Sequence, residues 1–482
     1  MTDPAAKRSK YYVTTPIYYI NDVAHIGHAY STIAADVVAR YYRSVLGPDH
    51  VLFVTGTDEN SQKTTDAAEK AGLDVDTYTE RTAKQWQDNW DKLGISYDRF
   101  IRTTEADHAS TVQDILQKVY DNGDIYKGVY EGLYCVGHEA FMKEEDLVDG
   151  LCPDHKKPPE KIREENWFFR LSKYEQQVLE YIEANPEFIQ PTSRRNEVLS
   201  FIRQKGLEDF SISRESRTWG IRLPFDDTQV AYVWFDALIN YVTAAGYGTD
   251  KFEQWWPADL HIVGKDIIKF HCIYWPAMLL SAGLALPHKV FAHGFFTIDG
   301  TKVSKSLGNA IDPLELSEVY GNDALRYFLL REIPFGADGD FSLERFAVVY
   351  DTELGNKLGN LVARTAAMLT KYCDSSYDET DVAADLKLYD NITRLEFDKY
   401  LADVIGHCEQ LNTTIEETKP WQLAKQDPAK VREVLSAIAS ELVQLAQYLE
   451  PFLPDTAIKI RRIFANGKVD NSEGVLFPRI EK

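Results

Sequence analysis

Two short segments, far apart in the chain, carry residue types that bind phosphate. The first is His25-Ile26-Gly27-His28, which lies where a predicted strand gives way to a predicted helix. The free N–H groups of a helix N-terminus favour anions, and two imidazoles add donors at the same point. Gly27 places no side chain between the backbone and an approaching nucleotide. A tetrapeptide is weak evidence alone, and a capping turn around one buried histidine explains it equally well.

The second segment, residues 299–309, contains Lys302 and Lys305 among small, flexible and hydroxyl-bearing residues. A lysine ammonium is a movable point charge for phosphate, and Gly300 and Gly308 would let such a loop close around a ligand. Most lysine pairs lie on solvated surface loops, which is the alternative interpretation. The two segments together, in this order, favour one phosphate-binding site to which both contribute.

The elements that must position these segments predict a Rossmann-like α/β fold. Residues 11–19 and 51–56 are rich in β-branched and aromatic residues, and an amphipathic helical pattern runs between them. Strand, helix, strand in that order predicts parallel pairing. Because ligands bind beyond the carboxyl ends of parallel strands, His25, His28 and Asp58 should face one site. Further strands are predicted over residues 230–235, 260–263 and 289–293.

Two changes of pattern divide the chain. Short Tyr- and Gly-rich stretches with a Cys/His cluster interrupt the α/β pattern, and four or five amphipathic helices replace the strands towards the C-terminus. We therefore expect an α/β catalytic domain with a small inserted domain and an α-helical bundle. The predicted boundaries are 1–119 and 216–325 for the two halves of the catalytic domain, 120–215 for the insertion, 326–350 for a junction and 351–482 for the helical domain.

Net charge and cysteine content limit the function classes. Lys plus Arg number 53 and Asp plus Glu 75, a formal net charge of −22, so a nucleic-acid binder with this balance needs a segregated basic face. Five scattered cysteines do not make a disulfide framework. The longest weakly polar run, residues 272–287, falls short of the roughly 20 apolar residues that span a bilayer, so no membrane partner is expected. The N-terminus lacks the apolar region of a secretory signal, and we expect a cytoplasmic protein.

In its two phosphate-binding segments the chain resembles the class I aminoacyl-tRNA synthetases, whose signatures are His-Ile-Gly-His and Lys-Met-Ser-Lys-Ser. Val303 replaces methionine in the second signature, an exchange of one apolar side chain for another. The resemblance implies that ATP and Mg²⁺ bind here and that both segments stabilise the pentavalent phosphorus during amino-acid activation. It implies catalytic roles for His25, His28, Lys302 and Lys305, with Lys305 the most important lysine. The ATP contacts that it implies are Gly27, Gly264, Lys265, Asp266, Ser304 and Ser306.

Stretches between the signatures resemble the methionyl-tRNA synthetases in particular. The resemblance implies a pocket for L-methionine built from Pro16, Ile17, Tyr19, Asp58, Trp234, Ala237, Tyr241 and His293. Aromatic walls suit a flexible thioether chain, and Asp58 can pair with the substrate ammonium. Ordinary core packing is the alternative for Trp234 and Tyr241. The insertion is too short to be the editing domain of the larger relatives for Leu, Ile and Val.

The insertion contains a Cys-x₂-His pair twice, at Cys135 and His138 and at Cys152 and His155. Two chelating pairs on tight turns suit a closed tetrahedral Zn²⁺ site with a structural role. Similar insertions in methionyl-tRNA synthetases often hold one zinc, commonly with more cysteines, and His138 stands in a usual cysteine position. The alternative is two reduced cysteines and two surface histidines that fall near each other by chance.

In the helical domain, Asn360 and Arg364 lie one helical turn apart, and Trp421 follows a proline on a later segment. These residues match anticodon elements of the methionyl-tRNA synthetases, which implies that they bind the anticodon of tRNA(Met). Bases of a single-stranded loop can stack on an exposed aromatic ring, and Asn and Arg can donate to base edges. Trp421 could instead cap a helix and Arg364 could be solvated. The resemblance also implies that residues 326–350 contact the tRNA stem, and the missing dimerisation domain implies a monomer.

The activity that the resemblance implies is that of a methionine-tRNA ligase. The methionine carboxylate attacks the α-phosphorus of ATP, pyrophosphate leaves, and methionine then passes from the adenylate to the 3′-terminal ribose of the tRNA. No protein nucleophile is needed, because positioning and donors aimed at the phosphoryl charge supply the catalysis. Two alternatives stay open, namely an adenylyl or nucleotidyl transferase acting on a small metabolite and a non-catalytic tRNA-binding paralogue.

Overall fold

A six-stranded parallel sheet forms the centre of the computed structural model, which describes residues 8–21, 23–135, 140–142, 144–153, 156–215, 219–298, 301–302 and 311–480. Its strand order is β3-β2-β1-β12-β13-β7, and every neighbouring pair is parallel. The strands are β1 (Tyr11–Tyr19), β2 (Val51–Asp58), β3 (Arg99–Arg102), β7 (Ile189–Gln190), β12 (Leu260–Gly264) and β13 (Val290–His293). The α/β class and the Rossmann-like arrangement predicted from sequence are confirmed.

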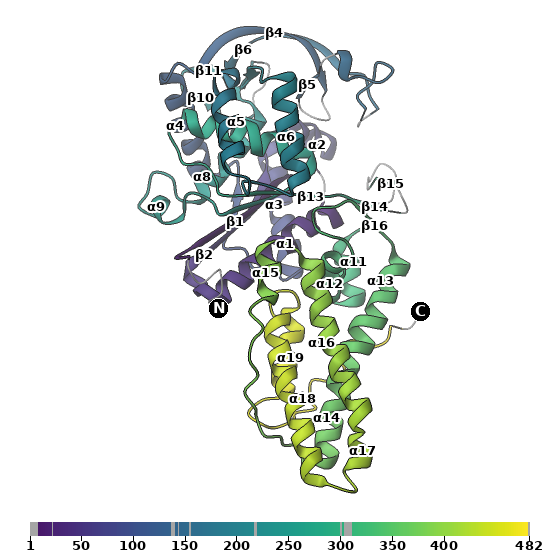
Figure 1. Cartoon of the computed structure of the whole chain (residues 1–482). Coiled ribbons are helices and arrows are strands. Elements are labelled where there is room, and N and C mark those ends of the chain that lie inside the picture. The colour runs from purple at the N-terminus through teal and green to yellow at the C-terminus, as the bar shows by residue number, and fades with distance from the viewer. Residues whose placement is uncertain are drawn as a thin grey trace.

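The helix α1 (Ile26–Leu46) connects β1 to β2 and follows the predicted pattern. Most of its residues, 14 of 21, are buried because the helix lies between the sheet and the helices that follow later in the chain (Figure 1). Every residue of β2 is buried as well, as expected for a strand covered on both faces. The next helices are α2 (Gln62–Ala71), α3 (Val75–Lys92) and α4 (Ala106–Asp121).

The insertion contains an antiparallel sheet at the end of the molecule opposite to the helical domain (Figure 1). Its long central pair is β4 (Ile125–Cys135) with β6 (Glu160–Phe169), which run antiparallel from Ile125 opposite Phe169 to Tyr134 opposite Glu160. The shorter members are β5 (Ala140–Met142) and β8 (Phe210–Ser211), and the helices of this part are α5 (Glu175–Ala184) and α6 (Thr192–Lys205). The predicted domain boundaries stay predictions.

The strand predicted over residues 230–235 is wrong in its second half. Strand β11 (Asp226–Ala231) ends early, pairs with β9 (Ser213–Arg214) and β10 (Arg222–Leu223), and lies outside the parallel sheet. The chain then turns at Tyr232 into α7 (Val233–Leu238), so Trp234 and Phe235 are helical. Tertiary contacts of the helix outweigh the β-propensity of these aromatic residues. The helices α8 (Asn240–Ala244) and α9 (Lys251–Trp255) follow.

A second small sheet lies where the catalytic part meets the helical domain. It consists of β14 (Phe296–Ile298), β15 (Thr301–Lys302) and β16 (Gly339–Phe341) in the order β15-β14-β16. Before it runs a π-helical turn over Phe270–Tyr274 that leads into α10 (Trp275–Ser281). After it come α11 (Pro313–Tyr320), α12 (Asn322–Arg331) and α13 (Leu343–Val349).

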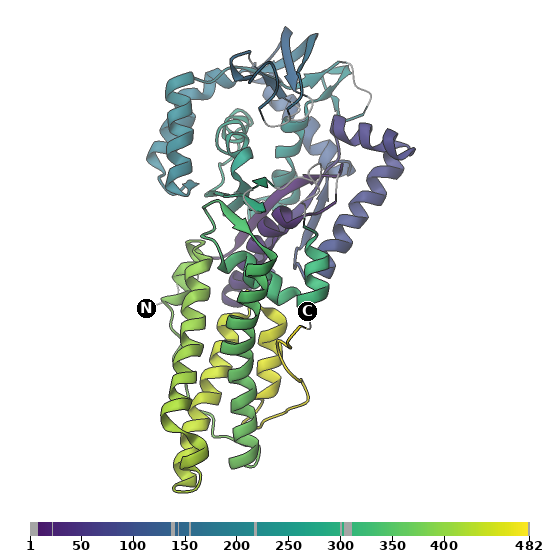
Figure 2. The same cartoon turned by 90° about the vertical axis from the view of Figure 1, so that its right-hand side faces the viewer.

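The C-terminal part is an elongated helical bundle (Figure 2). A π-helical segment over Tyr350–Gly359 leads into α14 (Asn360–Tyr372), followed by α15 (Leu388–Thr393), α16 (Phe397–Thr418), α17 (Pro420–Leu423), α18 (Pro428–Leu449) and α19 (Pro454–Ile463). The prediction of four or five helices corresponds to the long ones, since α15 and α17 are too short to show a helical period. Across the described ranges, every helix is too short or too polar to cross a membrane.

A buried ion pair ties the catalytic part to the helical domain. Asp36 of α1 and Arg326 of α12 lie 2.6 Å apart and are both almost fully buried. Arg326 also donates to the backbone oxygens of Pro451 (2.9 Å) and Phe452 (2.7 Å), at the turn between α18 and α19. Burial alone would raise the pKa of Asp36, but the positive charges of Arg326 and Arg40 outweigh burial and lower it. Asp36 is therefore charged at neutral pH, and its helix is fixed to the far domain.

Candidate active site

The first predicted phosphate-binding segment forms the N-terminal cap of α1. The Nδ1 atom of His25 accepts from the N–H of Gly27 (3.0 Å), and the Nδ1 atom of His28 accepts from the N–H of His25 (3.2 Å). The two rings stack with centroids 3.7 Å apart. Because Nδ1 is the acceptor in each ring, Nε2 carries the hydrogen in the neutral form. Each imidazole is thus oriented as an Nε2–H donor beside a helix N-terminus, which suits it to bind an anion.

An aromatic cluster holds His28 from behind. Trp86 of α3 meets the His28 ring edge to face at 5.0 Å and stacks on Tyr18 at 5.1 Å. The Tyr18 hydroxyl bonds to the Thr32 hydroxyl on α1 (2.8 Å), which fixes its ring. Trp86 is almost completely buried. The histidine pair therefore lies on a rigid support drawn from β1, α1 and α3.

The second predicted segment is described only at its two ends. Lys302 lies in β15 opposite Thr297, and its side chain, like Ser304, Lys305 and Ser306, falls outside the described residues. The chain is described again from Ile311, whose backbone oxygen accepts from the N–H of Ile26 at the start of α1 (3.2 Å). The chain following the lysine segment thus returns to the histidine pair.

The carboxyl ends of four neighbouring strands bring the other predicted residues together. Tyr19 of β1 pairs in register with Asp58 of β2, and Gly264 of β12 pairs in register with His293 of β13. Strand β1 lies between β2 and β12. From β1 the chain continues into β2 and β3 on one side, whereas β12 and β13 on the other side come much later in the sequence. The carboxyl end of β1 is therefore a topological switch point, where open α/β sheets bind ligands.

Pro16 and Ile17 lie at an irregularity of the same strand. The pairing of β1 with β2 shifts between Thr14 and Ile17, and Pro16 occupies the shift, where it need not donate to a ladder. Ile17 is half-buried and packs against the apolar cluster that also contains Tyr241. Ile17 thus belongs to the same apolar cluster as Tyr241, a residue of the aromatic wall predicted to hold methionine.

That wall is built from α7, α8 and the π-helical turn after β12. The Trp234 ring stacks on Phe270 with centroids 3.7 Å apart and planes 5° apart. The buried Tyr241 hydroxyl donates to Nε2 of His271 (2.8 Å), whose Nδ1 donates to the Ile267 oxygen (3.0 Å). Ala237 is buried and lies about one helical turn from both Trp234 and Tyr241. Its side chain is only a methyl group, so it takes up little space between these two rings.

Three buried imidazoles make the surroundings of this wall uncharged. Burial lowers the pKa of His271 to about 4, the pKa of His293 to about 4, and the pKa of His261 well below its ordinary value. The Tyr241 ring lies 4.3 Å from His261. A neutral, aromatic environment suits an apolar side chain with a polarizable sulfur. Phe270, His261 and His271 were missed from sequence, although Phe270 and His271 stand only a few residues after the predicted Gly264-Lys265-Asp266 segment.

His293 bridges β13 and α1. Its Nε2 accepts from the Ser31 hydroxyl (2.6 Å), and its Nδ1 donates to the Gly294 oxygen (2.8 Å). Ser31 lies one turn after His28, so this bond fixes the position of the first turns of α1 relative to strand β13. The predicted contact of His293 with methionine stays a prediction, since both of its ring nitrogens have protein partners here.

The predicted adenosine segment folds back on itself. The Asp266 carboxylate lies so close to Gly264 that a side-chain carbon at Gly264 would meet it at 2.6 Å. The Lys265 ammonium pairs with Asp338 and lies 4.9 Å from the Phe295 ring. A larger residue at position 264 would displace the Asp266 carboxylate from its present position. Lys265 joins the end of β12 to the start of β16 in the small second sheet.

The predicted zinc ligands are described in part. Cys135 ends β4 and Cys152 precedes a tight turn, closed by bonds from Lys156 N to Cys152 O and from Cys152 N to Lys157 O (2.9 Å each). Both thiols are buried, and neither forms a disulfide. His138 and His155 lie outside the described residues, among which no three metal-binding side chains gather. Two buried thiols, one at the end of β4 and one at a turn, each three residues before a histidine, fit the donor set of a structural zinc site.

The predicted anticodon residues lie in the helical bundle, away from the catalytic part (Figure 1). Asn360 is exposed at the start of α14, and Arg364, one turn later, pairs with Glu416 of α16 (2.7 Å). Trp421 lies in α17, just beyond the end of α16, and is half-buried. All three belong to neighbouring helices, because the Arg364–Glu416 pair joins α14 to the last turn of the helix that precedes Trp421.

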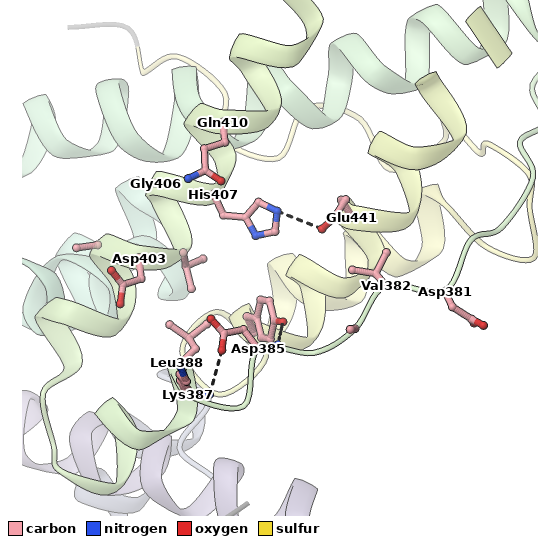
Figure 3. A pocket seen from close by; sticks show the side chains of 14 residues that line it. Asp381, Val382, Asp385, Lys387, Leu388, Asp403, Gly406, His407, Gln410 and Glu441 are labelled. Carbon is pink, nitrogen blue, oxygen red and sulfur yellow. Dashed lines mark hydrogen bonds and ion pairs between the residues drawn. The ribbon is translucent and has the colours of Figure 1, made fainter. Parts of the chain in front are cut away.

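The helical domain also contains a cavity of about 850 Å³ that includes no predicted site residue. Figure 3 shows it between the loop around Asp381 and Asp385 and the helices that carry His407 and Glu441. His407 pairs with Glu441 (3.1 Å), and carboxylates predominate among the charged groups that line the cavity. Such a lining repels phosphate, so this cavity is distinct from the candidate active site.

Known proteins match both the sequence and the fold. The family model for tRNA synthetases class I (M) matches residues 11–158 and 155–366. A methionine-tRNA ligase of Caldanaerobacter subterraneus subsp. tengcongensis is 48% identical over 471 residues, which cover 94% of this chain and 73% of that protein. One of Rickettsia felis is 44% identical over 472 residues, covering 94% and 91%. The Mycobacterium tuberculosis methionyl-tRNA synthetase in complex with methionyl-adenylate superposes with a TM-score of 0.93 at 38% identity, covering 98% of this chain and 100% of that one.

Proposed function

Because this chain belongs to the class I (M) tRNA synthetase family, we propose that it joins L-methionine to tRNA(Met) at the expense of ATP. It is a methionine-tRNA ligase that forms methionyl-adenylate and pyrophosphate and then transfers methionine to the 3′-terminal ribose. The observation that carries this function is the position of the histidine pair, which caps α1 beside the strand ends of Tyr19 and Asp58. Groups that can donate to phosphate and a carboxylate that can accept from an ammonium would thus act at the same edge of the sheet.

In the activation step, His25 and His28 donate from Nε2 to the phosphate oxygens of ATP. Their Nδ1 atoms are already used by backbone N–H groups, so the donors need no reorientation as charge develops on phosphorus. Lys302 and Lys305, with Ser304 and Ser306, approach the same phosphates from the second signature. The bond between Ile26 and Ile311 supports this approach, because it anchors the end of that segment at the start of α1.

Methionine binds with its ammonium at Asp58 and its side chain against Trp234 and Tyr241. The carboxylate then lies towards the histidine pair, from which it attacks the α-phosphorus in line. The stacked Trp234 and the hydrogen-bonded Tyr241 hold their rings before substrate arrives, which reduces the entropy lost on binding. Tyr19 and Ile17 close the pocket from β1.

Two metal ions accompany this function. Mg²⁺ binds with ATP and screens its phosphate charge. Cys135, His138, Cys152 and His155 would hold Zn²⁺, which would stabilise the insertion without taking part in the reaction. The two buried thiols, Cys135 at the end of β4 and Cys152 at a turn, support this assignment.

The anticodon of tRNA(Met) binds at the far end of the helical domain. Trp421 offers a ring on which a base stacks, while Asn360 and Arg364 donate to base edges. The ion pair between Arg364 and Glu416 lies on the surface, where such a pair is weak. Arg364 can therefore leave Glu416 and donate to a base of the anticodon instead. We propose a monomer in the cytoplasm. The small-metabolite transferase is disfavoured, since the relatives match through the helical domain as well as the sheet.

Pyrophosphate exchange with each of the twenty amino acids, followed by charging of unfractionated tRNA, tests the function. The expected result is strong exchange with methionine alone among them and methionine acceptance by tRNA(Met). Exchange that is equally fast without methionine would refute the ligase. Exchange without any charging would instead indicate that the helical domain no longer binds tRNA.

A further inference from the structure

Asp236 is a buried carboxylate that joins three elements beneath the predicted methionine pocket. Its Oδ1 accepts from Nε2 of His108 on α4 (2.7 Å), and its Oδ2 accepts from the side-chain amide of Asn60 (2.8 Å). The accessible surface of Asp236 and of His108 is 0%, and Asn60 is also buried. Asp236 is not among the predicted site residues, and both of its oxygens are engaged by side chains from other parts of the chain.

The hydrogen-bonded chain continues at both ends. Nδ1 of His108 lies 3.1 Å from the hydroxyl of Thr243 on α8, and the amide of Asn60 also donates to the backbone oxygen of Thr103 (3.0 Å). The series Thr243, His108, Asp236, Asn60 and Thr103 therefore crosses from α8 through α4 and α7 to the loop after β3. Removing one member of such a buried chain leaves its partner without a hydrogen bond, which lowers the stability of the fold.

Three members of this chain each stand two residues after a group predicted to contact methionine. Asn60 follows Asp58, whose carboxylate faces the substrate ammonium. Asp236 follows Trp234, and Thr243 follows Tyr241, both in the wall for the side chain. The chain of hydrogen bonds therefore connects the ammonium end of the pocket to the side-chain end.

The helices that carry the wall cannot hold their own position. Helix α7 has six residues and α8 has five, and neither has a side-chain hydrogen bond at its N-terminus. Helices this short are unstable alone, so tertiary contacts decide where they lie. The two hydrogen bonds of Asp236 connect α7 to α4 and to the segment after β2, which are distant in the sequence.

We propose that Asp236 is a positioning residue that sets the distance between Asp58 and the wall formed by Trp234 and Tyr241, and so sets the length of side chain that the enzyme accepts. The proposal rests on the function proposed above. Asp236 does not touch the substrate and acts through Asn60 and His108. An apolar pocket discriminates one methylene by about 10- to 200-fold, and that discrimination requires walls at a fixed separation.

The test compares pyrophosphate exchange supported by methionine, by ethionine, which is one carbon longer, and by norvaline, which is shorter. Asp236→Ala should raise the KM for methionine and lower the kcat/KM ratio of methionine to ethionine by at least about 10-fold, with the KM for ATP within about twofold. Asp236→Asn should keep selectivity within about threefold, because its oxygen can accept from Asn60 and its amide can donate to His108 in the other tautomer.

Asp323→Ala is the matched control. Asp323 is a buried carboxylate of α12 that accepts from the backbone N–H of Thr456 (2.6 Å), far from the pocket. It should lower thermal stability and leave the methionine-to-ethionine ratio unchanged. If Asp236→Ala does not fold, Asn60→Ala removes one bond of the chain and should lower the ratio by about threefold or more.

Three results decide between the explanations. An unchanged ratio in a folded Asp236→Ala or Asn60→Ala variant would overturn the positioning role, while methionine-dependent exchange by the parent protein would leave the proposed function intact. An equal loss of selectivity in Asp323→Ala would show that the effect is general destabilisation and would also overturn it. A parent protein without methionine-dependent exchange would refute the function itself and the inference with it.

Discussion

Replacing Arg326 with methionine removes the buried tie between the two parts of the molecule. The variant loses the 2.6 Å ion pair with Asp36 and the two bonds from Arg326 to the oxygens of Pro451 and Phe452. Methionine fills much of the volume and adds no polar group. The carboxylate of Asp36 keeps Arg40 at 2.7 Å and the Ser96 donors, which offsets part of the loss.

The expected cost is about 3 to 5 kcal/mol, the range found when one partner of a buried ion pair is removed. Two lost hydrogen bonds to backbone oxygens account for about 1 kcal/mol each. Arg40→Ala is the control, because Arg40 pairs with the same carboxylate from a partly exposed position and should cost no more than about 1 kcal/mol. The double variant Asp36→Asn with Arg326→Met should recover most of the loss, since no uncompensated charge remains.

Urea unfolding measures the change in the free energy of unfolding. Circular dichroism follows the loss of helix, and tryptophan fluorescence follows mainly the catalytic part, which contains most of the tryptophans. Arg326→Met should separate the two transitions and should reduce tRNA charging more than pyrophosphate exchange. A loss below about 1 kcal/mol, or a double variant no more stable than Arg326→Met, would refute the assignment of this pair as the tie between the domains.

Three further predictions concern the other parts of the site. Trp421→Ala should reduce methionine charging of tRNA by about 10-fold or more, as expected for a lost stacking contact of about 1 to 3 kcal/mol, and should leave pyrophosphate exchange unchanged; equal loss in both assays would contradict the anticodon role. Burial lowers the pKa of His271 to about 4, so the stability that this neutral imidazole contributes is full above about pH 6.5 and is lost as pH falls towards 4, by about 3 kcal/mol in total. His271→Gln should make the loss of stability between pH 6.5 and 4 smaller, with His261 and His293 still contributing, and an unchanged pH profile would count against this assignment. Metal analysis should give about one zinc per chain in the parent protein and a clear loss in Cys135→Ser, whereas zinc-free parent protein of full thermal stability would refute the structural site.

The elements that carry a strong local pattern were predictable. Helix α1 and the two strands beside it have the expected apolar periodicity, and β1 and β2 pair in parallel as predicted, with Asp58 at the carboxyl end of β2. The structure of the region after residue 230 was not predictable from sequence. Its Val, Tyr, Trp and Phe residues favour a strand but pack equally well on a short helix. In the helix, Asp236 bonds to partners more than 100 residues away, which no local pattern reveals.

Residues that act through distant partners gave no signal in the sequence. His108 stands on an ordinary amphipathic helix, and its bond to Asp236 depends on how α4 and α7 meet in the folded chain. His271 and His261 become neutral only through burial, which a single sequence does not reveal. The resemblance identified Trp234 and Tyr241 as expected pocket residues. Phe270, on which Trp234 stacks, is identified only by the structure, because a π-helical turn places it there.

A crystal structure with a non-hydrolysable methionyl-adenylate analogue tests the account most directly. The phosphate should lie within hydrogen-bond distance of Nε2 of His25 and His28, the ammonium beside Asp58, and the thioether between Trp234 and Tyr241. An adenylate bound with its phosphate away from the start of α1, or with its side chain outside that wall, would contradict the claim that these strand ends form the site of methionine activation.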